Sequence, residues 1–186
     1  MTNSKQAPLP SYDHGPSAER LLGSTLGDHF SQMVQQRGSA DALVDVAQNK
    51  RYSYTTMKIE VDRAARGLLS MGIEKGDRVG IWSTNNAEWL ISMLAIWSIG
   101  GILVNINPSY KTQELEYVLK QSGVKLLITV PGHRTSDYLK MLREIAHQLF
   151  SADSVNDPSE VPELQSIIVI GNKKDLEGKL PGSLKS

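Results

Sequence analysis

Short β-branched runs alternate with helical patterns along the sequence, and this alternation constrains the fold more than any other feature. Apolar runs fall at residues 78–82, 102–106, 125–130 and 166–170. Each run is continuous rather than alternating, which is typical of strands that are covered on both faces. Helical patterns separate successive runs. The order strand, helix, strand, repeated in this way, predicts an α/β fold with a parallel sheet wound by helices.

Capping residues mark the ends of several helices. The helix before the first run is predicted to begin at Thr55 or Thr56 and to end at Gly72, because glycine readily adopts the left-handed conformation of a helix C-terminus. Leu69 is predicted to lie on the buried face of this helix. A further helix is predicted over residues 137–150.

Two features precede the first of these runs. Residues 1–20 are polar and contain proline, so they are predicted to form a flexible N-terminal arm without a signal peptide. Residues 42–54 hold two short extended runs joined by Gln-Asn-Lys, which predicts a β-hairpin. We therefore expect an arm over residues 1–20 and one α/β domain over residues 21–186.

Composition limits the classes of function. The chain has 20 Lys and Arg residues against 20 Asp and Glu residues, so it lacks the basic surplus that nucleic-acid binding favours, and no nucleic-acid partner is expected. The absence of cysteine excludes disulfides and thiolate chemistry. The most apolar stretch, residues 89–106, is interrupted by Gly100 and Gly101 and is not expected to span a membrane. These features predict a soluble, cytoplasmic protein.

Two motifs suggest chemistry, but neither is complete. Residues 172–175, Asn-Lys-Lys-Asp, resemble the guanine-binding element of GTPases, yet the Gly-x-x-x-x-Gly-Lys-Ser/Thr phosphate loop of those enzymes is absent. The four histidines, His14, His29, His133 and His147, lack the spacing of a zinc site. No metal site is therefore predicted.

The best local candidate for a binding site follows the run at residues 102–106. Asn107, Pro108, Ser109 and Tyr110 come directly after it, at a point where proline ends the strand. Ligands of wound α/β sheets bind beyond the carboxyl ends of the strands. The same residues also fit a plain connection between a strand and a helix, and spacing alone does not separate the two interpretations.

Four sequence blocks carry a family resemblance through their order and spacing. They are RYSYTTMK at residues 51–58, GDRVGIWSTNNAEWL at 76–90, IWSIGGILVNINPSYK at 96–111 and VKLLITV at 124–130. Together they resemble the N-terminal part of AMP-forming acyl-CoA synthetases, which belong to the adenylate-forming ligase superfamily. The third block is similar to that of medium-chain and general fatty acyl-CoA synthetases.

The resemblance implies an ATP-dependent ligase that joins a fatty acid to coenzyme A through an acyl-adenylate. ATP, Mg²⁺ and CoA are the implied cofactors of the whole enzyme. The family's phosphate-binding loop, which ends in Pro-Lys-Gly, and its catalytic-lysine block are absent from the sequence. We therefore expect the N-terminal part of a longer enzyme, which is mostly scaffold, contains no catalytic residue, binds no cofactor by itself and is inactive alone.

The resemblance also singles out four residues for the CoA route. Asn107, Pro108 and Ser109 match a family segment that faces the path taken by CoA. Arg134 falls near the position where some relatives contact the nucleotide phosphates of CoA, a role that suits the guanidinium fork. An exposed loop arginine without this role is the alternative interpretation of Arg134.

Two other functions stay open at this point: a non-catalytic binding or oligomerisation module of the same ancestry, and another adenylate-forming ligase.

If the chain is part of a longer enzyme, strands 102–106 and 126–130 are predicted to lose a covering layer. Exposed aliphatic side chains favour association, and an open sheet edge can pair with another copy of the chain. We therefore expect the chain to self-associate, most simply as a two-fold dimer.

Overall fold

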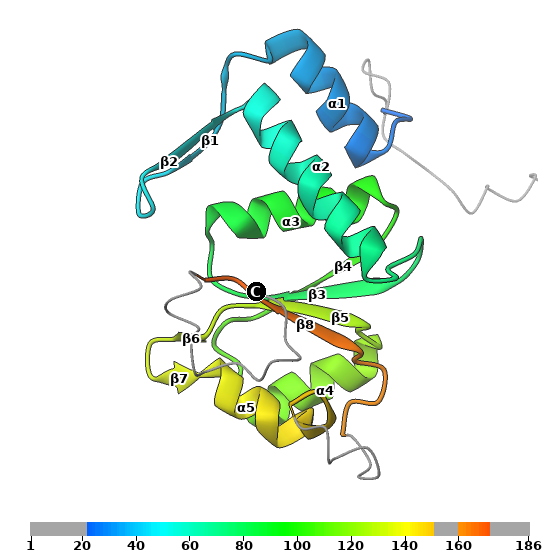
Figure 1. Cartoon of the computed structure of the whole chain (residues 1–186), viewed down its shortest axis with the longest axis vertical. Helices are drawn as coiled ribbons and strands as arrows, with labels where there is room; N and C mark the ends of the chain where they lie inside the picture. Colours follow the sequence, from blue (N-terminus) through cyan, green and yellow to red (C-terminus); the bar gives the residue numbers. More distant parts are fainter. Residues whose placement is uncertain (1–21, 151–159, 172–186) are drawn as a thin grey trace, which may run out of the picture.

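The computed structural model describes residues 22–150 and 160–171, and its centre is a parallel sheet with the strand order β4-β3-β5-β8 (Figure 1). The helices are α1 (Leu26–Arg37), α2 (Tyr54–Ser70), α3 (Ala87–Ser98), α4 (Thr112–Ser122), α5 (Tyr138–Ile145) and the 3₁₀ turn η1 (His147–Leu149). The strands are β1 (Asp41–Asp45), β2 (Lys50–Ser53), β3 (Arg78–Trp82), β4 (Ile102–Ile106), β5 (Leu126–Thr129), β6 (Gly132–His133), β7 (Ser136–Asp137) and β8 (Ser166–Val169). The predicted α/β fold with a wound parallel sheet is confirmed.

Helices cover both faces of the sheet, so the molecule has two apolar cores. Helices α1, α2 and α3 lie over one face, and α4 and α5 lie under the other (Figure 1). Side chains of β3 alternate between them: Val79 and Ile81 enter the first core, whereas Trp82 enters the second. Gly80 allows close packing on the α4 side, because a Cβ atom there would lie 3.0 Å from a methyl group of Leu127.

The start of α2 differs from its predicted position. Ser53, rather than Thr55 or Thr56, caps the helix, since its hydroxyl oxygen accepts a hydrogen bond from the Thr56 amide at 3.2 Å. The prediction that Leu69 is buried is wrong, because that side chain is 54 % exposed on the outer side of α2. Gly72 has the predicted left-handed conformation, with φ of 79°.

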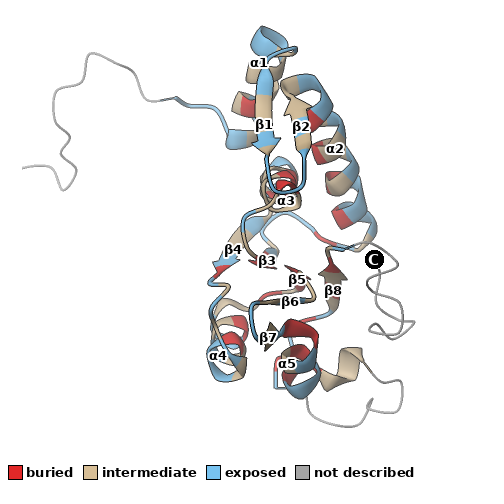
Figure 2. Cartoon of the chain, turned by 90° about the vertical axis from the view of Figure 1, so that its left-hand side faces the viewer, coloured by how far each residue is buried: buried red, intermediate tan, exposed pale blue. Residues whose placement is uncertain are grey.

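The predicted β-hairpin at residues 42–54 is confirmed as the antiparallel pair β1–β2, which packs against the N-terminus of α3 (Figure 2). The Asp45 carboxylate accepts a hydrogen bond from the Ala87 amide at 3.0 Å, in the first turn of that helix. Lys50 forms an ion pair with Glu88, and Gln48 donates a further hydrogen bond to it. Burial opposes ionisation of Glu88, but these contacts lower its pKa overall.

Two other expectations change. Strand β5 is not exposed by a missing layer: Leu126, Leu127 and Ile128 are buried, because β5 lies between β3 and β8 under helices on both faces. The predicted helix at 137–150 ends at Ile145 and continues as η1. The short pair β6–β7 was not predicted.

The predicted arm at residues 1–20 and the motif at 172–175 lie outside the described residues, and the domain boundaries at 21–186 stay a prediction. No helix in the part of the chain that the structure describes is long and apolar enough to cross a membrane.

An ion pair lies at the amino ends of the parallel strands, and it makes the free energy of unfolding depend on pH. Lys125 Nζ lies 2.6 Å from the Asp77 carboxylate, which also accepts a hydrogen bond from the Glu74 amide at 2.8 Å. The hydrogen bond from Lys125 is the main cause of a lowered pKa of Asp77, and the Glu74 amide adds to it. The pair therefore stabilises the fold above the pKa of an aspartate in an unfolded chain, and its contribution is lost as pH falls through the lower folded-state pKa.

We predict that Asp77→Asn lowers the free energy of unfolding by about 1 kcal/mol at pH 7, because a partly buried charged hydrogen bond is lost. The difference from the wild type should vanish in acid, once Asp77 is protonated. Urea unfolding between pH 2 and pH 7 measures it, with Glu163→Gln at an exposed position before β8 as the control. A difference that does not change with pH would contradict this account.

Candidate functional site

The carboxyl ends of the parallel strands lie together at one end of the sheet, where the chain leaves each strand through a loop (Figure 2). The loop after β4 holds Asn107, Pro108, Ser109 and Tyr110, and the loop after β5 contains the β6–β7 hairpin with Arg134. This end of the sheet is where ligands of wound α/β sheets bind. The structure therefore places all five sequence-predicted site residues on two loops at the carboxyl ends of the strands.

A buried aromatic pair joins these two loops to the central strand. Trp82 at the end of β3 stacks on Tyr138 at the start of α5, with ring centroids 3.6 Å apart and planes inclined by 9°. Trp82 Nε1–H donates a hydrogen bond to the carbonyl oxygen of Asn107 at 3.1 Å. The Tyr138 hydroxyl donates one to the carbonyl oxygen of Pro108. The backbone at both candidate residues is thus held by side chains from two other elements.

The chemistry of Tyr138 suits this holding role. Burial raises the pKa of its hydroxyl, so the group stays protonated and remains a hydrogen-bond donor at neutral pH. The loop also has an internal bond, because the Asn107 side-chain oxygen accepts a hydrogen bond from the Ser109 amide at 2.9 Å. The side chains of Asn107 and Ser109 are themselves exposed, and a ligand at this end of the sheet can reach them.

An open cleft of about 780 Å³ lies between the loops that follow β3 and β4. It is lined by Ser83, Thr84, Asn85, Trp89, Asn105, Asn107, Pro108 and Tyr110. Apart from the ring of Pro108, these groups are hydroxyls, amides and aromatic rings, and none of them is charged at neutral pH. The cleft can donate and accept hydrogen bonds and can contact a planar or aliphatic group, but it offers no acid or base with an ordinary pKa near neutrality.

Arg134 carries a positive charge on the loop after β5. It lies at the tip of the β6–β7 hairpin, is exposed, and adopts a left-handed backbone conformation with φ of 54°. That conformation is uncommon for a residue with a side chain. Lys111, directly after the β4 loop, donates a hydrogen bond to the Ser136 hydroxyl at 2.6 Å, which connects the hairpin to the loop.

Sequence reasoning found the loops but missed what holds them. Trp82 and Tyr138 are 56 positions apart in the chain, and no local pattern signals that their rings stack. The contact between Lys111 and Ser136 was missed because the hairpin itself was not predicted. Among the described residues, no group of three His, Cys, Asp or Glu side chains lies close enough together to hold a metal ion.

Solved structures with the same fold include CoA ligases. The N-terminal domain of FACL13 from Mycobacterium tuberculosis superposes with a TM-score of 0.67 at 21 % identity, over 78 % of this chain and 33 % of that one. The anthranilate CoA ligase AuaEII, solved in complex with anthranoyl-AMP, superposes with a TM-score of 0.66 at 23 % identity, over 88 % of this chain and 28 % of that one. The fold is thus that of the N-terminal domains of adenylate-forming ligases.

The sequence places the chain more narrowly. The family model of AMP-binding enzymes matches residues 30–182, and the chain belongs to this family. It is 37 % identical over 185 residues to the mitochondrial medium-chain acyl-CoA ligase ACSF2 of Macaca fascicularis. The aligned residues make up 97 % of this chain and 29 % of that protein. It is also 37 % identical over 155 residues to the putative acyl-CoA synthetase YngI of Bacillus subtilis strain 168, covering 83 % of this chain and 28 % of that protein. The chain thus spans less than a third of the length of these relatives.

We predict that Tyr138→Phe loosens the β4 loop without unfolding the chain. The substitution keeps the stack on Trp82 but removes the hydrogen bond to Pro108, so unfolding should become easier by about 1 kcal/mol. Amide hydrogen exchange at Ser109 and Tyr110 should become faster. Tyr117→Phe, which changes an exposed hydroxyl on α4, is the control. Unchanged exchange in the loop would show that Tyr138 does not hold it.

Proposed function

We propose that this chain forms part of an ATP-dependent fatty acyl-CoA ligase and contributes one wall of its CoA route. In the overall reaction the carboxylate of the fatty acid displaces pyrophosphate from ATP, and the thiol of CoA then displaces AMP from the acyl-adenylate. The family match and the relatives named as acyl-CoA ligases support this proposal. The names of these relatives favour it over other adenylate-forming ligases, and a non-catalytic module of the same ancestry stays the alternative.

The observation that carries the proposal is the uncharged cleft together with an exposed arginine on the next loop at the carboxyl ends of the strands. CoA consists of a chain with amide groups, a heterocyclic base and several phosphate groups. The amide side chains of Asn85, Asn105 and Asn107 suit the amides of that chain. The exposed guanidinium of Arg134 suits a phosphate, which it can bind through two parallel hydrogen bonds. The stack of Trp82 on Tyr138 would keep the β4 loop in place during binding.

The described residues suit CoA, but they do not suit ATP and Mg²⁺. Phosphate oxygens bound to Mg²⁺ are usually accompanied by one or two carboxylates and by backbone amides of a glycine-rich loop. No carboxylate lines the cleft. We therefore assign no step of the adenylation chemistry to residues 22–150 and 160–171, and we propose that these residues act as scaffold and as CoA contacts. The cytoplasmic location stays a prediction.

The first expected outcome is that the 186-residue chain has no ligase activity of its own. Nothing in the described part of the chain positions the phosphates of ATP for attack. Pyrophosphate release should be measured with Mg·ATP, CoA and fatty acids of several chain lengths, with one of the full-length relatives as the positive control. Turnover above a protein-free blank would contradict this assignment.

The proposed CoA contact departs from the sequence-based expectation that the chain binds no cofactor by itself, because the cleft and the loops beside it are formed within the described residues. Calorimetric titration of the chain with CoA tests it. We predict that Arg134→Ala weakens CoA binding about fivefold, which corresponds to about 1 kcal/mol for one exposed charged contact. Arg66→Ala removes an exposed arginine from α2, away from this end of the sheet, and should leave the affinity unchanged. Equal affinities of the wild type and Arg134→Ala, or a folded chain that does not bind CoA, would overturn the proposed contact.

A further inference from the structure

Strand β4 forms an open edge of the sheet. It pairs with β3 on one side in a regular register over all five residues, and no strand lies on its other side among the described residues. Its sequence, Ile-Leu-Val-Asn-Ile, contains no charge and no proline. Natural edge strands usually carry lysine, proline, a bulge or a covering element that prevents pairing with other chains. A regular, uncharged edge of this kind can accept another strand.

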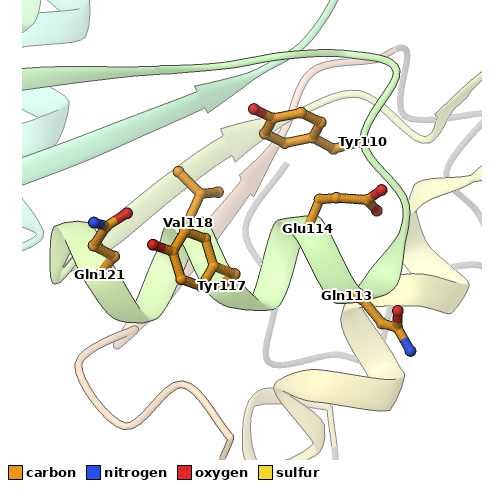
Figure 3. Close-up of a pocket in the computed structure, with 6 residues that line it drawn as sticks. All are labelled: Tyr110, Gln113, Glu114, Tyr117, Val118 and Gln121. Carbon is orange, nitrogen blue, oxygen red and sulfur yellow. The ribbon is translucent and has the colours of Figure 1, made fainter.

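The helix beside this edge presents an uncharged strip. Gln113, Tyr117 and Gln121 follow one another at intervals of four residues on α4, and Tyr117 is 64 % exposed. They line a shallow groove with Tyr110 and Val118, which Figure 3 shows along one side of the helix. The groove also contains the carboxylate of Glu114, which is engaged with the Lys111 amide at 3.0 Å.

The strip adjoins the strand rather than lying elsewhere on the surface. Helix α4 packs under β4, and Val118 contributes to the same apolar core as Val104. At the start of the strand, Ile102 is 47 % exposed. The edge and the strip therefore form one surface, defined by Ile102–Ile106 and by the α4 residues Gln113, Tyr117 and Gln121. Apart from the Glu114 carboxylate in the groove, this surface carries no charged side chain. Charged residues are likewise depleted at the centre of protein interfaces.

We propose that two copies of this chain associate through this surface, with their β4 strands paired antiparallel about a two-fold axis. An antiparallel pair centred on Val104 places Ile102 of each copy opposite Ile106 of the other and Leu103 opposite Asn105. No like charges meet in this register, and like charges directly opposite each other would destabilise a strand pair. The surface is thus complementary to itself, as an isologous interface requires.

Other surfaces of the sheet fit a second copy less well. Both faces are covered by helices, so association through an exposed face, which the sequence suggested, has no basis on β5. The opposite edge, β8, is one residue shorter. The apolar groove beside β8 is bordered by the charged side chains of Glu60, Arg63 and Glu88. These charges would have to be desolvated in a symmetric contact, which costs free energy.

The proposed contact is small, so the dimer should be reversible. A stable interface typically buries about 800 Å² on each partner. A pair of five-residue strands with one flanking helix strip falls near the low end of such contacts. We therefore expect a dissociation constant in the micromolar range, and a monomer-to-dimer transition that is visible on dilution.

Sedimentation velocity over about 1 to 500 μM, a range that spans the expected dissociation constant, tests the proposal with four variants. One of them, Ile170→Lys, lies directly after β8. Ile102→Lys places a charge on the edge strand, and Tyr117→Glu places one on the strip. Each should weaken the dimer at least tenfold. Ile59→Lys makes the same kind of change at a 52 % exposed position on α2 and should leave the dimer intact. Circular dichroism establishes that each variant is folded, and hydrogen exchange should show protection of residues 102–106 that increases with concentration.

Several results would overturn this inference. A wild-type chain that stays monomeric at 500 μM would contradict the expected micromolar dissociation constant and therefore the interface. Equal weakening by Ile59→Lys would show unspecific association, and assembly beyond a dimer would show that the contact is not a closed two-fold one. A dimer that is lost in Ile170→Lys but kept in Ile102→Lys and Tyr117→Glu would place the contact at the β8 edge.

Discussion

The burial of β3 on both faces and its pairing along both edges is the constraint on which the remaining structure depends. The strand is paired in parallel register with β4 on one side and β5 on the other, and its side chains enter both cores. Side chains on one face hold α2 and α3, and those on the other hold α4 and α5. Because every layer contacts this strand, the position at which it ends fixes where the loops at the carboxyl ends of the strands begin.

Trp82 transmits this constraint to the candidate site. It is the last residue of β3, and through its indole N–H and its stack on Tyr138 it holds the loop after β4. The hairpin with Arg134 follows β5, the other neighbour of β3, and is connected to the same loop through Lys111. A surface made of two separate loops is in this way held as one unit. Such preorganisation limits the entropy that is lost when a ligand orders a binding loop.

The features that sequence reasoning predicted are those with a local cause. The four parallel strands, the β1–β2 hairpin and the position of Asn107 at a strand end follow from β-branched runs, glycines and a proline. The features that it missed depend on contacts between distant positions. The exposure of Leu69 depends on where α1 and α3 pack against α2, and the burial of β5 depends on its central place in the strand order. The hold of Tyr138 on Pro108 spans 30 positions and has no local signature.

The central claim is that the β4 loop and the β6–β7 hairpin act together as a CoA-binding surface. Amide chemical shifts measured while CoA is added to the labelled chain test this claim most directly, because they report all residues except proline at once. The account predicts that the largest shift changes fall at residues 107, 109 and 110 and at residues 132–137, and that they share one dissociation constant. Changes confined to the apolar groove between α2 and β8, or different constants for the two loops, would contradict it.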